Sequence, residues 1–490
     1  MQLSDKEILD IIQQDHIDQD RHGIGITSFR KIRAKLGLLR TRQQKHTLDS
    51  IRSPIVELRE RFPKAGVREM KNILFWEKGM CVGRRLITAY FKLYESDLLR
   101  ERKQGRLKRR RFWAAGVNDI LAVDQHDKWK RFGLALHTGI DPFVGKVQWM
   151  KVWWTNNNPK LILSYYLEIV EKHGFMPMVT QSDPGSENYG IANAHTTLRH
   201  WHDPSLAGTI QHRWMRQKKN VMPEIAWSQL RRRFTPGFED ILEYGVANGI
   251  YDSSRILDEL VFRWVFIPWM QKELDAWCTR INNSRKRKDR NKILPHGVPN
   301  LIYDSPHRFG CLDFKINVQP EAVEHVRNLY APADDPVFEL VPAEFAHHAQ
   351  VLYESMGKPV VTWKNVWDVY SELLRRFENL EIAIQSIAEW ELRREEIEVQ
   401  ESLEPVALPP MYALPQGREL LGGQDVVDKE GNYYMGGVNN GLGLDRLDSD
   451  EFEIGDETDD EQPDPRPTDY EDIEVVFTDE EVDSEQDDEW

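Results

Sequence analysis

ILAVDQHDKW, at residues 120–129, places the carboxylate of Asp124 after an apolar run, which is the pattern of a buried strand. VTQSDPGSEN, at residues 179–188, repeats this arrangement with Asp183. Each segment therefore predicts a strand that ends in an acidic residue. The two carboxylates would share a site if the two strands were neighbours in one sheet.

A third acidic residue, Glu224, lies 41 positions after Asp183 in NVMPEIAWSQLRRR, residues 220–233. Pro223 suits the first turn of a helix, where its missing N–H group removes no hydrogen bond. A helix that begins here could turn Glu224 back toward the two aspartates. The predicted apolar anchors of this helix are Ile225, Leu230 and, as a further candidate, Trp227.

The elements around these segments predict an α/β fold. Strands are predicted at 119–125, 131–141, 145–154 and 177–183, with a helix at 158–173 before the last of them. A further helix and strand are predicted at 191–201 and 208–214. This is the element order of an RNase H-like fold, a mixed five-stranded sheet with helices. In that fold the first and fourth strands lie side by side.

Three carboxylates at the ends of predicted elements indicate a metal site. Carboxylates are hard oxygen ligands that suit Mg²⁺ or Mn²⁺. Two such ions, about 3.5–4 Å apart, stabilise the attacking and leaving oxygens of phosphoryl transfer together. We expect Asp124 to bridge two ions, Asp183 to hold one of them and Glu224 the other.

Other side chains compete for these roles. Asp127 is a rival of Asp124, although its register turns it away from the end of the first strand. Glu187 is a rival of Glu224 but fits a capping or supporting role better. We expect His126 and His212 to be structural rather than metal ligands.

Several motifs between residues 110 and 303 support the same interpretation. They are Asp124 with Lys128; Gly133, Leu134, His137, Ile140 and Asp141; Asp183, Gly185, Glu187 and Asn188; Asn220, Glu224, Trp227, Leu230 and Arg231; and Trp277 and Asn282 before LPHGVPNLIY at 294–303. This pattern resembles the integrase core family, the DDE superfamily of retroviral integrases and transposases. It is most similar to the transposon-derived type found in fungi and animals.

The resemblance implies a role for each matched residue. Asp124, Asp183 and Glu224 would be the catalytic triad and the metal ligands. The supporting residues would be Glu187, Asn188 and Asn220. The sequence departs from the family at Met222 and Pro223, where Arg and Ile are usual, and at Pro184, where Arg is usual. The zinc-binding HHCC module of retroviral integrases is absent.

Charge is distributed unevenly along the 490 residues, whose net charge is -15. Residues 441–490 hold 23 acidic residues and two arginines, whereas residues 1–115 hold 27 basic and 14 acidic residues. A basic N-terminal region favours nucleic-acid binding, and the acidic tail is typical of a disordered, solvated segment.

Three widely spaced cysteines favour a reducing compartment. The polar N-terminus and the lack of a long apolar run predict an intracellular protein that does not cross a membrane.

The N-terminal 115 residues predict helix-turn-helix units. Ser4 and Glu7 form a capping box for a helix over about 4–14. A basic helix, capped by Thr27 or Ser28, follows a glycine-containing turn. Further helices are predicted at 54–62, 66–77 and 82–95, the last with an apolar face formed by Leu86, Ala89, Tyr90 and Leu93.

Basic side chains on these helices and on two basic segments are candidates for DNA contact. They are Arg30, Lys31 and Arg33; Arg84 and Arg85; Arg109, Arg110 and Arg111 in the segment 99–111; and Arg285 and Lys286 in the segment 282–292. A solvated helix face or loop is the alternative at each place. The two segments would serve equally well as nuclear localisation signals.

These observations predict seven regions. They are a helix-turn-helix region at 1–98, a basic linker at 99–116, an integrase core at 117–235, its helical extension at 236–303 interrupted at Pro268, a mixed or helical region at 304–400, a Pro/Gly-rich linker at 401–440 and the acidic tail at 441–490. A long amphipathic helix at 363–399 is expected to dock on its own chain rather than to form a coiled coil.

Two functions fit this organisation. The first is a nuclear, DNA-binding enzyme that uses two Mg²⁺ or Mn²⁺ ions to cut DNA strands and join them to target DNA. The second is a domesticated protein whose core no longer cleaves and which acts through DNA or chromatin. A homo-oligomer, and basic partners such as histones bound by the acidic tail, are compatible with either function.

Overall fold

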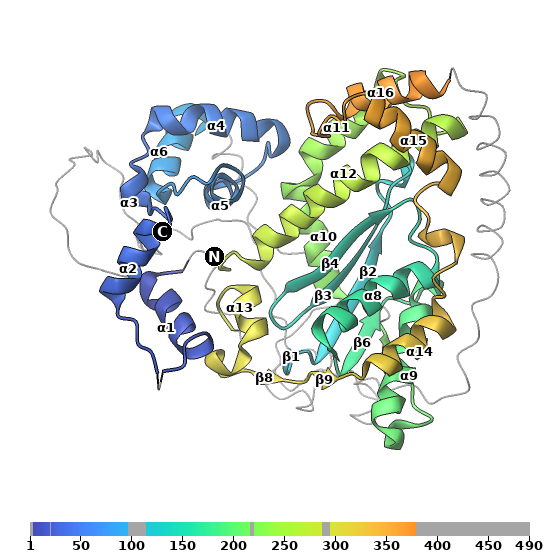
Figure 1. Ribbon diagram of the computed structural model, residues 1–490, viewed down its shortest axis with the longest axis horizontal. Coiled ribbons are helices and arrows are strands. Elements are labelled where there is room, and N and C mark those ends of the chain that lie inside the picture. Colours follow the sequence, from blue (N-terminus) through green and yellow to red (C-terminus); the bar gives the residue numbers. More distant parts are fainter. Residues whose placement is uncertain (1–2, 20, 97–113, 216–219, 287–294, 379–490) are drawn as a thin grey trace, which may run out of the picture.

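The computed structural model describes residues 3–19, 21–96, 114–215, 220–286 and 295–378 (Figure 1). A five-stranded sheet forms its centre, with the strand order β4-β3-β2-β6-β7. The strands are β2 (Ile120–His126), β3 (Ala135–Asp141), β4 (Lys146–Trp153), β6 (Val179–Ser182) and β7 (His212–Trp214). Strand β3 is antiparallel to both of its neighbours, β2 and β4, whereas β6 is parallel to β2 and to β7. This is the predicted mixed sheet of an RNase H-like fold, and β2 and β6 are neighbours as expected.

Helices cover both faces of the sheet because its strands carry apolar side chains on both sides. Leu121 and Val123 pack under α8 (Pro159–His173), α9 (Tyr189–His202) and α14 (Pro320–Tyr330). On the other face, Leu136 and Ile140 pack against α10 (Val221–Arg233), α11 (Thr235–Ala247) and α12 (Ile256–Asn282). Figure 1 shows the sheet between these two layers.

The N-terminal region is helical. It contains α1 (Asp5–Asp15), α2 (Ile26–Lys35), α3 (Thr41–Gln44), α4 (Leu48–Arg61), α5 (Val67–Lys78) and α6 (Arg84–Tyr94). Ser4 and Glu7 form the predicted capping box of α1. The N-cap of α2 is Gly25, so the prediction of a Thr27 or Ser28 cap is wrong. Both residues lie inside the first turn of the helix instead.

Helices α4 to α6 share one hydrophobic core with the helices behind the sheet. The ring of Phe62, after α4, meets the ring of Phe238 in α11 edge-on, with centroids 6.2 Å apart. Gly237 of α11 lies against the backbone of α4, and a Cβ atom at this position would come within 2.0 Å of the Arg61 carbonyl oxygen. The buried residues of α6 are Ile87, Tyr90 and Phe91, so the predicted apolar face is shifted, and Leu93 is exposed.

The remaining described elements wrap around the core. They are β1 (Gly116–Val117), which pairs with β8 (Leu312–Asp313); β5 (Phe175–Met176), which pairs with β9 (Ile316–Asn317); and helices α13 (Pro299–Asp304), α15 (Ala343–Ser355) and α16 (Val366–Phe377). Leu373, Leu374 and Phe377 of α16 are buried in the core that α12 also enters. Docking on its own chain is therefore observed for this part of the predicted long helix. Leu380 and Ile382 lie outside the described residues.

Helix α12 is continuous through Pro268, which corrects the prediction of a break there. Proline removes one backbone donor and its ring crowds the preceding turn. The Pro268 ring lies on the exposed side of the helix, whereas Phe266, Ile267 and Trp269 beside it are buried. Packing on both sides of the proline keeps the helix in one piece. Among the described residues, no helix has the length and apolar character needed to cross a bilayer.

Candidate active site

Asp124 lies on β2, which continues two residues beyond it to His126. Its carboxylate oxygen Oδ2 accepts a hydrogen bond of 3.0 Å from the indole N–H of Trp227. The Trp227 ring also stacks on His126, with centroids 4.9 Å apart and planes 16° from parallel. Alternation along the strand places Asp124 and His126 on the same face of the sheet, so α10 covers both side chains.

Asp183 follows the last residue of β6. Because β6 is the parallel neighbour of β2, the two aspartates lie at the same edge of the sheet, as predicted. The Asp183 oxygen Oδ1 is buried and accepts no hydrogen bond within the described part of the chain. His212 of β7 is buried and bonded to the hydroxyls of Thr180 and Ser182, which gives it a structural role.

Glu224 lies in the first turn of α10, after Asn220 at the N-cap. The side-chain amide of Asn220 is fully buried and donates to the carbonyl oxygen of Val123 at 2.8 Å. Its oxygen accepts from the Gln181 side chain at 3.3 Å. Asn220 therefore fastens the start of α10 to both β2 and β6, next to the two aspartates.

The three carboxylates interact electrostatically. Burial and the charge of Asp183 raise the pKa of Asp124 to about 8, and the charge of Glu224 acts in the same direction. Burial also raises the pKa of Asp183. A carboxylate whose pKa is raised by neighbouring acidic charges, beside a buried oxygen that accepts no hydrogen bond from the described residues, forms a place where a cation would be stabilised.

This donor set fits Mg²⁺ or Mn²⁺, which prefer carboxylate oxygens. Within the described ranges, no three His, Cys, Asp or Glu side chains meet closely enough to form a ready-made metal site. Asp183 and Glu224 are therefore close enough to Asp124 to raise its pKa, but the three carboxylates do not converge on a single point.

Glu187 and Asn188 form a buried support beside Asp183. The Asn188 amide donates to Glu187 Oε1 at 2.7 Å. The Glu187 carboxylate lies over Gly185, where a Cβ atom would come within 2.1 Å of Oε1. Burial and the charge of Asp127 raise the pKa of Glu187. Asp127 itself accepts from Asn156 and pairs with Lys130 at 3.0 Å, so it is held on the other side of the strand.

The predicted DNA-contact residues fall into three groups. Lys31, Arg84 and Arg85 are exposed, and so is Arg30, although it also bonds to Asp5 at 2.9 Å. Arg109, Arg110 and Arg111 lie outside the described residues. The third group consists of three residues that contact other parts of the chain: Arg33, Arg285 and Lys286.

Arg33 is buried, and its guanidinium donates to Asp5 Oδ1 at 2.6 Å. The Lys286 ammonium donates to the carbonyl oxygens of Val144 and Gly145. Both side chains therefore have internal partners, a carboxylate for Arg33 and a turn between strands for Lys286, and DNA contact by either of them stays a prediction. Arg285 is partly exposed and forms an ion pair with Glu7 of α1.

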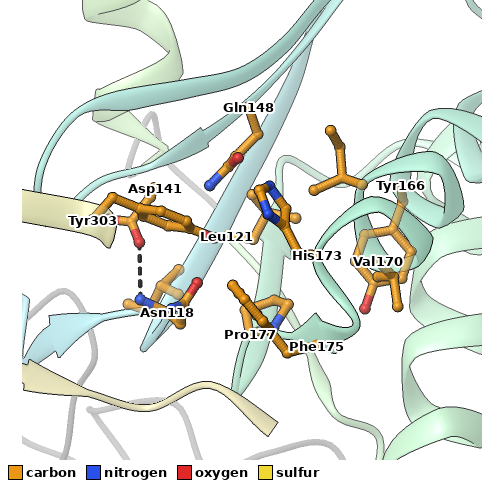
Figure 2. A pocket seen from close by; sticks show the side chains of 12 residues that line it. Asn118, Leu121, Asp141, Gln148, Tyr166, Val170, His173, Phe175, Pro177 and Tyr303 are labelled. Carbon is orange, nitrogen blue, oxygen red and sulfur yellow. Dashed lines mark hydrogen bonds between the residues drawn. The ribbon is translucent and has the colours of Figure 1, made fainter. Parts of the chain in front are cut away.

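A small pocket lies at the opposite end of β2 from Asp124 (Figure 2). Gln148, His173 and Tyr303 provide polar groups in its lining, and the Lys146 ammonium lies 3.8 Å from the centre of the Tyr303 ring. The backbone N–H of Asn118 donates to the Asp141 carboxylate at 2.9 Å. These partners hold the turn that precedes β2, and the pocket is separate from the triad.

Sequence reasoning missed the contact between Trp227 and Asp124. Its signal was the spacing of three positions between Glu224 and Trp227, which puts both side chains on one face of a helix. The sequence pattern identified Trp227 only as a candidate apolar anchor. It is buried as expected of an anchor, but it also presents a polar N–H group to the site.

The mixed sheet has the order β4-β3-β2-β6-β7. Asp124 lies on β2, Asp183 directly follows the neighbouring strand β6, and Glu224 lies in α10. This arrangement is that of an RNase H-like core of the DDE type. Residues 112–299 match the family model of the integrase core domain. This part of the chain is therefore similar to integrase core domains. A search of curated proteins found no match to the chain.

Proposed function

We propose that this protein is a metal-dependent polynucleotidyl transferase that cuts DNA strands and joins a 3′-hydroxyl group to target DNA. The observation that carries the proposal is the placement of Asp124 and Asp183 at the same edge of the sheet, on the neighbouring parallel strands β2 and β6, with Glu224 close enough to act on the pKa of Asp124. The integrase core match supports the same class of reaction.

In this proposal Asp124, Asp183 and Glu224 hold two Mg²⁺ or Mn²⁺ ions. The ions would activate water or a 3′-hydroxyl group and stabilise the leaving oxygen. Asn220 fixes the distance between α10 and the strands, and the neighbouring Glu187 and Asn188 support Asp183. Trp227 and His126 form the apolar wall beside Asp124, which limits access of bulk water to that carboxylate.

DNA would be held by exposed basic side chains of the N-terminal helices, including Lys31, Arg84 and Arg85, and by the segment 99–111. The chemistry requires access to chromosomal or element DNA, so we place the protein in the nucleus. We further propose that the acidic segment 441–490 binds basic partners and that the active form is a homo-oligomer. The charge of the tail supports the first of these two proposals.

The activity is testable with labelled duplex oligonucleotides and either Mg²⁺ or Mn²⁺. We expect the wild-type protein to yield nicked and strand-joined products, and Asp124→Asn and Glu224→Gln to reduce them by at least about 100-fold, in the range seen when groups that act on the transition state are removed. Glu168→Gln is the matched control, because Glu168 pairs with Lys151 on the surface at 2.7 Å. It should keep full activity.

The second candidate is a domesticated DNA-binding protein without catalytic activity. Met222 and Pro223, which replace the family's usual residues directly before Glu224, favour this alternative. If wild-type protein and triad variants were equally inactive while they still bound DNA, the enzymatic proposal would be refuted and this candidate retained.

A further inference from the structure

Trp227 occupies a position that packing alone does not explain. Its ring is buried, with 6% of its surface exposed, and it lies flat on His126 at 4.9 Å. Its only polar atom, Nε1, points at Asp124 Oδ2 from 3.0 Å. Apolar packing could be provided by an aromatic ring without a polar atom, so packing does not explain why an N–H group faces Asp124.

The chemistry of an indole suits this place. The Trp N–H group is a donor only, so it can orient a carboxylate without taking its proton. It also carries no formal charge, whereas an arginine or lysine at the same position would compete with a metal ion for Asp124. Burial of the ring strengthens the bond, because water is kept away from it.

The bond also sets the rotation of α10. Glu224 and Trp227 are separated by three positions and therefore share one face of the helix. Asn220 is bonded to Val123 and Gln181 at the start of the same helix. With fixed points before and after it, Glu224 has little freedom to turn away from Asp124.

We propose that Trp227 is a positioning residue of the metal site: its indole N–H holds the Asp124 carboxylate in place and locks the turn of α10 that presents Glu224. This inference rests on the proposed function, since it assumes that Asp124 and Glu224 hold divalent metal ions. Trp227 itself touches neither metal nor DNA in this proposal.

The first test measures Mn²⁺ binding directly, from the electron paramagnetic resonance signal of free Mn²⁺, without any DNA reaction. Trp227→Phe keeps an aromatic ring at this place, although a smaller one, and removes the donor. We expect its Mn²⁺ affinity to fall by about 10–100-fold, the usual effect of losing a partner of a metal ligand. Trp227→His, which restores a ring N–H donor, should recover part of this loss.

Trp367 provides the matched control. It is likewise buried and donates its indole N–H, at 2.7 Å, to the Ile241 carbonyl oxygen, far along the helical layer from the triad. Trp367→Phe should lower the melting temperature as much as Trp227→Phe while leaving Mn²⁺ affinity within about twofold of wild type, since its partner is no metal ligand. Equal Mn²⁺ affinities for wild type and Trp227→Phe would overturn the proposal.

A second measurement covers the case in which the phenylalanine variant does not fold. In wild-type protein labelled with ¹⁵N-tryptophan, one indole signal should shift when Mg²⁺ is added and should be displaced in Asp124→Asn. If every indole signal were unaffected by both changes, Trp227 would not be coupled to the site. Failure of wild-type protein to bind Mn²⁺ at all would instead refute the proposed function on which this inference rests.

Discussion

The Asn220 side chain donates to the carbonyl oxygen of Val123, the residue directly before Asp124. This single bond connects the helix that carries Glu224 to the strand that carries Asp124. It spans 97 positions of the chain, so it exists only when the sheet and α10 are correctly assembled.

Asn220→Ala should therefore weaken both the fold and the site. The change leaves the buried carbonyl oxygen of Val123 and the Gln181 amide without their partner, which costs about 1–3 kcal/mol for such groups. Thermal unfolding and Mn²⁺ titration would measure the two effects. Asn248→Ala is the control, because Asn248 makes a similar bond to Tyr244 on an exposed helix end; it should change stability by less than about 0.5 kcal/mol. Unchanged stability of Asn220→Ala would contradict the role of this bond.

Asp124→Asn should stabilise the metal-free protein at alkaline pH. The pKa of Asp124 is raised to about 8 in the folded protein, and its ordinary value is about 3.9. Between these values the folded state holds a proton that the unfolded state has lost. Stability must therefore fall as pH rises from about 4 to about 8, and this fall should be absent from the variant.

Melting temperatures in a chelator at several pH values test this expectation. A gain of about 1 kcal/mol corresponds to about 2–4 °C for a domain of this size. Asp240→Asn, on the exposed face of α11, serves as control and should follow the wild-type curve. Added Mg²⁺ should raise the melting temperature of wild type but not of Asp124→Asn. A variant less stable than wild type at pH 8 would contradict the electrostatic explanation.

Substitution by methionine should affect stability at Arg33 but not at Lys31. Removing the Arg33 guanidinium leaves the buried Asp5 carboxylate with Arg30 and Arg40 as its remaining partners. Loss of one partner from a buried pair costs up to about 3–5 kcal/mol, so Arg33→Met should lower the melting temperature of the N-terminal helices.

Lys31→Met should leave stability within about 0.5 kcal/mol, because this side chain is exposed. If Lys31 contacts a DNA phosphate, the variant should lower the slope of log affinity against log salt by about 1. Electrophoretic mobility shifts at several salt concentrations would measure this slope. Equal effects of the two variants on stability would show that Arg33 is not the internal support described above.

Helix α1 should loosen from the core at high ionic strength. Ion pairs from Glu7 to Arg285 and from Asp15 to Arg308 link this helix to segments beside the core. Surface pairs contribute about 0–1 kcal/mol each, and the Debye length falls from about 30 Å at about 0.01 M salt to about 3 Å at about 1 M. Hydrogen exchange of the α1 amides should therefore accelerate with salt.

Asp15→Arg should reproduce part of the effect of salt, and the double change Asp15→Arg with Arg308→Glu should reverse it at low ionic strength, because Asp15 pairs with Arg308 and takes no part in the capping box of α1. Amides of α8, on the surface of the sheet, are the internal reference. Exchange rates in α1 that were independent of both salt and charge reversal would show that the helix is held by other contacts.

Local patterns predicted the part of the fold that depends on neighbouring residues. The apolar runs before Asp124 and Asp183, the proline before Glu224 and the capping box at Ser4 are short-range signals, and the corresponding elements are present. The burial of Arg33 could not be predicted in this way, because its partner Asp5 lies 28 positions away.

Tertiary packing accounts for the other differences. Proline usually predicts the end of a helix. In α12, the packing of the buried aromatic residues beside Pro268 keeps the helix continuous. Leu93 and Ile87 both fit an apolar face of α6, and only contact with α4 and α5 decides that Ile87 is buried. The polar role of Trp227 also depends on a partner that is distant in sequence.

The contact between the rings of Phe62 and Phe238 has a consequence for how the domains of such proteins can be recombined in evolution. The family match begins at residue 112, yet the apolar core continues without interruption into residues 51–91. A gene rearrangement that transferred only the matched segment would expose the apolar surface that helices α4 to α6 cover. The resulting protein would tend to aggregate. Helices α4 to α6 and the matched segment are therefore expected to be inherited, lost or exchanged together.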